Sequence, residues 1–281
     1  MGPVGKSGHA TDRVQQDLKG PRVEMKIDVE LDYELLAPGA ALLVLEAAGA
    51  EGQELLHASI DLGAVQHFAR VPAEEGIGER IVMRTPRRIT CRYSAEVKVT
   101  RPRPDLAALR ADDVERMPGD ALRYMLPSRY CQSERFVAFV NRRFDGLGGG
   151  ARVAAMLDWI GESIDYVIGS SDGDTTAADT FLLREGVCRD FAHLLIALCR
   201  AGQIPARIAS VYAPSVEPPD FHAVVEVYLG GAWHLVDPTG MAAADEMALI
   251  AVGRDATDIA FLTTVSGAEL KNQQVRVSRA G

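Results

Sequence analysis

The sequence predicts an α+β fold, in which a small all-β domain precedes a larger domain that mixes helices and strands. Three observations indicate this. Apolar and charged residues alternate without a fault over residues 23–33. After the proline-rich segment 101–104, apolar residues recur at helical spacing instead. Near residue 230, two apolar runs flank a Gly-Gly pair, which is typical of a β-hairpin.

Composition restricts the function classes. The chain has 281 residues, of which 47% are hydrophobic and 25% are charged, so it can build a full core. The formal net charge of −9 argues against a general binder of nucleic acid or of anionic membranes. No apolar run reaches the roughly 18 residues that a membrane span needs.

The N-terminal residues 1–21 are polar, rich in glycine and free of an apolar leader core, so we expect a disordered tail rather than a secretory signal. The cysteines are far apart and form no CxxC pair, and in a chain without a recognisable signal this favours reduced thiols and a cytoplasmic location. The four cysteines are Cys91, Cys131, Cys188 and Cys199.

The all-β domain is expected over residues 22–102. The alternation over 23–33 predicts a half-buried antiparallel strand. A short apolar run at 41–45 and a second alternating run at 91–99 predict further strands. The prolines of 101–104 close the domain, because proline cannot continue a strand ladder.

The second domain is expected over residues 103–281. Ser133-Glu134 precedes a run with helical spacing, which the glycines of 146–150 interrupt. A second amphipathic helix is predicted from about residue 153 to about 167. The polar loop that follows resembles a calcium loop only superficially, because Ala177 stands where the turn needs glycine.

A third helix is expected to begin at Cys188, directly after Gly186 and Val187. Asp190 lies in its first turn, where a carboxylate accepts backbone N–H groups, and Gly202 ends it. The start of a helix favours a thiolate over a thiol, so Cys188 is a candidate nucleophile. Its alternative role is that of a small buried residue, which is the role we expect for Cys199 in the helix interior.

The hairpin pattern over residues 220–239 selects one histidine as a partner. A two-residue turn at Gly230-Gly231 places His222 and Asp237 on the same face of the hairpin and His234 on the other. His193 lies in the cysteine helix but points away from Cys188, so we expect it to be packed or solvated.

Cysteine, histidine and aspartate together form an apparatus for acyl transfer: a nucleophile, a base and a carboxylate that orients the base. Two alternatives remain open from spacing alone. His222 and Asp237 could be a purely structural strand pair, or the three residues could bind zinc in a metal hydrolase.

These residues also resemble a known family. The order of motifs is similar to the core of the transglutaminase-like superfamily, in its bacterial branch of cysteine-protease-like proteins with an N-terminal β domain. The resemblance covers residues 150–240, and the matching segments are 186–192 (GVCRDFA), 203–207 (QIPAR), 222–229 (HAVVEVYL) and 233–239 (WHLVDPT).

The resemblance implies a papain-like core with the cysteine helix packed on an antiparallel sheet. It implies Cys188 as nucleophile, His222 as general base and acid, and Asp237 as the residue that orients it. It also implies an oxyanion hole made of the Cys188 backbone N–H and a second donor, for which Trp159 and Tyr166 are candidates; the position of Trp159 favours a core role.

The expected function is therefore a thiol acyl-transfer enzyme that cleaves or exchanges a peptide or glutamine-type amide, without a cofactor or metal. Its partner would be a peptide or protein substrate, and Arg189 is a further candidate for substrate contact. A non-catalytic protein-binding module with the same fold is the alternative.

Overall fold

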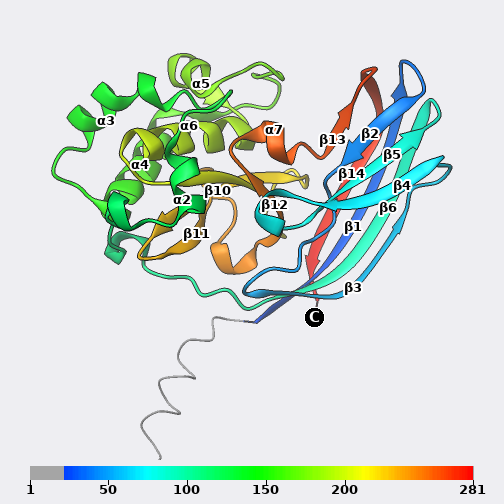
Figure 1. Cartoon of the computed structure of the whole chain (residues 1–281), viewed down its shortest axis with the longest axis horizontal. Coiled ribbons are helices and arrows are strands. Elements are labelled where there is room, and N and C mark those ends of the chain that lie inside the picture. Colours follow the sequence, from blue (N-terminus) through cyan, green and yellow to red (C-terminus); the bar gives the residue numbers. More distant parts are fainter. Residues whose placement is uncertain (1–21, 281) are drawn as a thin grey trace, which may run out of the picture.

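The computed structural model describes residues 22–280, and the predicted N-terminal tail lies outside this range. Three four-stranded sheets, one two-stranded sheet and a group of helices make up the described chain (Figure 1). The strands are β1 (Val23–Leu35), β2 (Gly39–Leu43), β3 (Gln53–Asp61), β4 (His67–Pro72), β5 (Glu79–Thr85), β6 (Arg88–Val99), β7 (Asp165–Tyr166), β8 (Glu185–Gly186), β9 (Ala206–Tyr212), β10 (His222–Leu229), β11 (Ala232–Val236), β12 (Ala248–Gly253), β13 (Leu262–Thr264) and β14 (Ala268–Arg279). The helices are α2 (Gly119–Leu122), α3 (Val137–Arg143), α4 (Gly149–Ser163), α5 (Ala177–Leu183), α6 (Cys188–Ala201) and α7 (Ala256–Ile259).

The β-rich half consists of two sheets, ordered β14-β1-β6-β3 and β13-β2-β5-β4, which Figure 1 shows beside the helical half. The predicted alternation explains this half, since every second residue of β1 is buried from Met25 onward. Buried side chains of both sheets belong to one hydrophobic core. The three strands predicted here are therefore present.

The sequence predicts that residues 103–281 all belong to the second domain, and this is wrong for residues 262–279. Strand β13 pairs with β2, and β14 pairs with β1 along almost its whole length, so the end of the chain completes both sheets of the β-rich half. The sequence did not reveal this, because β14 is exposed on both faces over its first five residues and shows no clean alternation.

The helical half is built around α6, which packs against β9 and β10 of the sheet β11-β10-β9-β12. The helix that was predicted to run to about residue 167 ends at Ser163 and is followed by strand β7. It also begins earlier, within the glycines that were expected to end the preceding helical run. A Cβ atom on Gly150 would lie 1.7 Å from the Leu106 carbonyl oxygen, so glycine is needed there for close backbone packing.

The two halves share a buried interface. The Gln53 side chain at the start of β3 donates to the Leu249 carbonyl oxygen (2.9 Å) and accepts from the Leu249 N–H (2.6 Å). The Tyr212 hydroxyl donates to the Leu45 carbonyl oxygen at 2.6 Å. These buried polar groups form hydrogen bonds with one another across the interface, so the two halves pack together as one structure. Within the described residues, no helix is long and apolar enough to cross a membrane.

Candidate active site

Cys188 is the first residue of α6, as predicted, and it is partly exposed. The carboxylate of Asp190 accepts a hydrogen bond from the Val187 N–H at 2.9 Å and so caps this helix. Gly186 is required for that approach, because a Cβ atom there would lie 2.7 Å from the Asp190 Cβ. The sulfur of Cys188 therefore sits at the positive end of a 14-residue helix whose entry is rigid.

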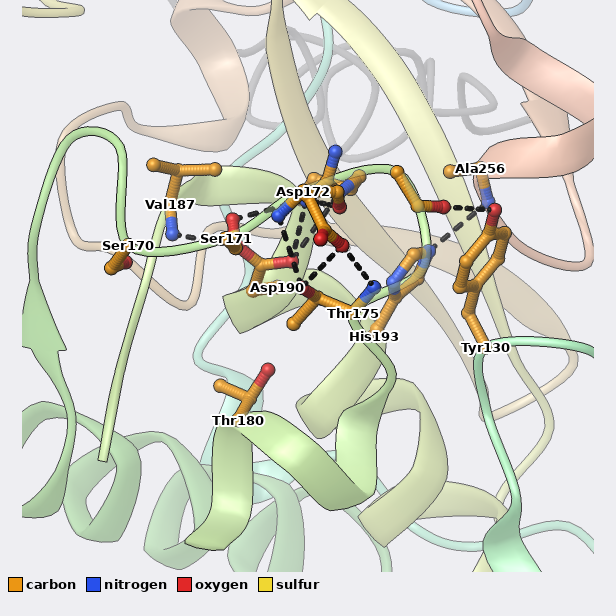
Figure 2. Close-up of polar contacts among 12 residues, drawn as sticks. Tyr130, Ser170, Ser171, Asp172, Thr175, Thr180, Val187, Asp190, His193 and Ala256 are labelled. Carbon is orange, nitrogen blue, oxygen red and sulfur yellow. Dashed lines mark hydrogen bonds and ion pairs between the residues drawn. The ribbon is translucent and has the colours of Figure 1, made fainter. Parts of the chain in front are cut away.

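A loop before the helix is tied to the same carboxylate (Figure 2). The Ser171 hydroxyl donates to Asp190, and the Arg189 guanidinium donates to Ser171 Oγ (3.0 Å) and to the Asp172 carbonyl oxygen (2.7 Å). Arg189 also forms an ion pair with Asp190 at 3.0 Å. The structure thus places Arg189, a predicted substrate contact, in the network that fixes this loop.

His193 lies deeper in the same helix and is fully buried. It accepts a hydrogen bond from the Ala256 N–H (3.1 Å), and its ring stacks on Tyr130 with centroids 4.9 Å apart (Figure 2). Burial lowers the pKa of His193 to about 4, so the imidazole is neutral at physiological pH. It is packed, in agreement with the expectation from helix geometry.

The hairpin has the predicted register: Leu229 pairs with Ala232 across the Gly-Gly turn. This brings together His222, the first residue of β10, and Asp237, which directly follows β11. Their Nε2 and Oδ2 atoms are 2.9 Å apart, and each side chain is 1% exposed. His234 instead contacts the Leu229 carbonyl oxygen at 3.0 Å and takes no part in the pair.

Asp237 is held by more donors than the sequence suggested. Its Oδ1 accepts from the N–H (2.9 Å) and hydroxyl (2.7 Å) of Thr239, and its Oδ2 accepts from the Ala242 N–H at 2.9 Å. Burial raises the pKa of Asp237, but the bond and charge of His222 and the Thr239 donors outweigh it, so the net shift is downward. The carboxylate is therefore ionised and fixed in one orientation.

His222 is the group that links Asp237 to the thiol. Burial disfavours the imidazolium, but the hydrogen bond to Asp237 and the neighbouring Cys188 side chain prevail and raise the pKa of His222 to about 9. Because Nε2 is bound to Asp237, Nδ1 is the nitrogen left for Cys188, whose side chain lies beside the ring. The ring thus lies between the carboxylate and the sulfur.

The two candidates for a side-chain oxyanion donor lie in different environments. The Tyr166 hydroxyl lies near both the backbone N–H and the side chain of Cys188; burial, followed by the Cys188 charge, raises the pKa of Tyr166 to about 12. The indole of Trp159 packs among Phe139, Phe181 and Arg184 and is 8% exposed. Only Tyr166 is therefore next to the nucleophile, and Trp159 belongs to the core.

The arrangement does not resemble a metal centre. Because Asp237 lies at Nε2 of His222 and Cys188 lies on the Nδ1 side, the three groups do not converge on one point. Across residues 22–280, no group of three or more histidine, cysteine and acidic side chains is placed to hold a metal ion.

Comparison with known proteins identifies the family of this fold. A family model for the transglutaminase-like superfamily matches residues 141–238, a segment that contains Cys188, His222 and Asp237. A crystal structure of a “putative cysteine protease” from Cytophaga hutchinsonii is 31% identical and superimposes with a TM-score of 0.86. That match covers 94% of this chain and 92% of the other, and so includes the β-rich half.

Two curated relatives are uncharacterized mycobacterial proteins. The one from Mycobacterium leprae is 33% identical over 120 residues, which is 39% of this chain and 42% of the relative. The one from Mycobacterium bovis is 30% identical over 128 residues, 40% of this chain and 41% of the relative. The matched region therefore spans less than half the length of these relatives.

Proposed function

Because the chain belongs to the transglutaminase-like superfamily, we propose that it is a thiol acyl-transfer enzyme that cleaves or exchanges a peptide or glutamine-type amide. The observation that carries the proposal is the alignment of three groups: a thiol at a helix start, an imidazole beside it, and a buried carboxylate 2.9 Å from the far side of that imidazole. This order of nucleophile, base and orienting acid is what acyl transfer requires.

In the proposed reaction, the Cys188 sulfur attacks the carbonyl carbon of the substrate, and the amide C–N bond breaks as the leaving amine takes a proton from His222. A thioester with Cys188 remains. An acceptor then attacks this thioester while His222 removes the acceptor's proton, and the acyl group leaves the sulfur, which restores the enzyme. Asp237 favours the protonated imidazole throughout, since its charge faces Nε2.

The acceptor decides between two activities. Water makes the protein a protease or amidase, and an amine makes it a transglutaminase. We favour water, because the related protein of known structure is described as a cysteine protease and its fold extends over nearly the whole chain.

Selective alkylation tests the nucleophile. Burial raises the pKa of Cys91, Cys131 and Cys199 to about 12 each, whereas Cys188 is partly exposed at a helix start. We expect limiting iodoacetamide at pH 7 to modify Cys188 at least about tenfold faster than the others. Peptide mass mapping measures this, and preferential modification of a buried cysteine would count against the assignment.

The same labelled protein separates an enzyme from a binding module. An activated ester should give a burst of released alcohol or phenol, about one equivalent per protein, and prior alkylation should remove it. A module with a reactive thiol but no catalytic function would release at most that one equivalent, because its thioester would not be deacylated, whereas an enzyme continues to turn over after the burst.

Tyr166→Phe tests the proposed oxyanion donor. Because the hydroxyl of Tyr166 stays protonated to about pH 12, it can donate to the developing oxyanion alongside the Cys188 N–H. We expect its loss to lower the acylation rate by roughly 10²-fold. Trp159→Phe is the control: it should reduce stability by about 1 kcal/mol and leave the rate of the folded enzyme within about twofold. Equal rate losses in both variants would contradict the assignment.

A further inference from the structure

A chain of hydrogen bonds leads from the β-rich half to the residues just before His222. The Tyr33 hydroxyl on β1 donates to Gln273 Oε1 on β14 at 2.9 Å. Gln273 Nε2 then donates to Asp220 Oδ1 at 2.7 Å. Asp220 stands two residues before His222, so the end of the chain reaches the entry of the strand that carries the proposed base.

A second contact fixes the residue in between. The ring of Phe221 stacks on Phe261, just before β13, with centroids 4.7 Å apart and planes at 9°. The Phe221 ring also packs against Tyr212 of β9, with ring centroids 5.7 Å apart. The Phe221 N–H also donates to Asp220 Oδ1 at 2.7 Å. Asp220 and Phe221, the two residues before His222, are therefore both held by contacts with other segments of the chain.

The orientation of the Gln273 amide follows from its two partners. An ionised carboxylate can only accept hydrogen bonds, so the NH₂ group faces Asp220 and the amide oxygen faces Tyr33. Burial, with the charge of Asp220 adding to the effect, raises the pKa of Tyr33 to about 12, so its hydroxyl keeps the proton that it donates to that oxygen. In this series of hydrogen bonds, Tyr33 donates, Gln273 accepts and donates, and Asp220 accepts.

Among the described residues, three titratable groups interact with the charge of Asp220. They are Tyr33 on β1, Tyr166 on β7 and His222 on β10. Burial raises the pKa of Asp220, while the Phe221 N–H, Gln273 and the charge of His222 act in the opposite direction. Loss of the Gln273 donor would therefore weaken the ionised form of Asp220 and free the segment that it anchors.

We propose that Gln273, oriented by Tyr33, is a positioning residue for His222, and that the β-rich half thereby completes the active site. The proposal rests on the proposed function, because it assigns a role in placing the base of that reaction. His222 is the first residue of its strand, and a strand end without such anchors frays. Misplacing a reacting group by about 1 Å costs on the order of 10²-fold in rate.

Gln273→Leu tests the proposal, with Gln274→Leu as the matched control on the same strand. Gln273 pairs with Leu31, whose side chain is buried, whereas Gln274 pairs with the exposed Glu30 and so lies on the other face of β14. We expect Gln273→Leu to lower kcat for an activated ester about tenfold with KM nearly unchanged. The control should stay within about twofold at equal folded concentration.

Gln273→Glu provides a readout that a purely structural role would not move. At low pH the introduced carboxyl group can share a proton with Asp220 and restore the bond, whereas at high pH the two charges repel. The rate relative to the wild type should therefore be within about threefold at pH 5 and fall by about tenfold or more at pH 8. Circular dichroism over this range should show a constant folded fraction.

The outcomes separate the two proposals. If Cys188→Ala removes the burst and both Gln273 variants behave like Gln274→Leu, the positioning role is wrong and the proposed function stands. If the burst survives in Cys188→Ala, the proposed function fails first. Equal losses in the Gln273 and Gln274 variants, or a Gln273→Glu rate that follows the wild type at every pH, would also overturn the positioning role.

Discussion

Cys188→Ala is expected to abolish the burst and to lower turnover by a factor of roughly 10⁴ or more, because Cys188 lies beside His222 and the other three cysteines are buried. The fold should survive, since the Cys188 side chain is partly exposed and the helix cap is made by Asp190 and the backbone of Val187. Single-turnover release from an activated ester measures the loss, and the thermal midpoint should stay within a few degrees of the wild type.

Cys199→Ala is the matched control in the same helix. Its side chain is fully buried, so the substitution leaves a small cavity and costs about 1 kcal/mol of stability. Its rate at equal folded concentration should remain within about twofold of the wild type. A full burst from Cys188→Ala, or a burst lost only in Cys199→Ala, would remove Cys188 from the mechanism.

The sequence predicted the candidate site better than it predicted the limits of the two halves. A Gly-Gly turn allows one hairpin register, and that register alone puts His222 and Asp237 on one face. Local rules also placed Cys188 at a helix start. These features depend on residues close in sequence, where turn and capping chemistry act directly.

Features that depend on distant partners were not predictable in this way. Strand β14 pairs with β1 across more than 230 residues, and its polar residues gave no periodic signal. The contact between Gln273 and Asp220 depends on that pairing, so nothing local indicated it. The glycines at 149 and 150 were interpreted as a helix break, whereas close packing against residues 106–111 requires them.

Asp237→Asn is expected to lower the acylation rate by roughly 10²- to 10³-fold. The amide must present its NH₂ group either to the Thr239 N–H, which is a donor itself, or to the side where His222 and the Ala242 N–H lie. The second orientation gives the NH₂ an acceptor in Nε2 of His222. The imidazole proton then moves to Nδ1, so that this nitrogen can no longer accept a proton from the thiol. A serine triad loses about 10⁴-fold from this change, and a thiol, which is a better nucleophile, should lose less.

The stability of the same variant should fall by about 1–3 kcal/mol, because the buried Ala242 N–H loses its acceptor. Rates must therefore be compared at equal folded concentration. His234→Asn is the control, since the His234 ring is hydrogen-bonded to the Leu229 carbonyl oxygen and lies outside the pair. Its rate should stay within about twofold of the wild type.

The pH dependence of kcat/KM tests the role of Asp237 more sharply than the rate at a single pH. In the wild type, Asp237 and Cys188 raise the pKa of His222 to about 9 against the effect of burial, so the imidazolium that pairs with the thiolate persists to about that pH and kcat/KM falls above it. Without the Asp237 charge, burial prevails and the pKa of His222 drops. The alkaline limb should then move to lower pH in Asp237→Asn and stay in place in His234→Asn. If His234→Asn removes the burst while Asp237→Asn keeps both the burst and the limb near pH 9, Asp237 does not orient the base.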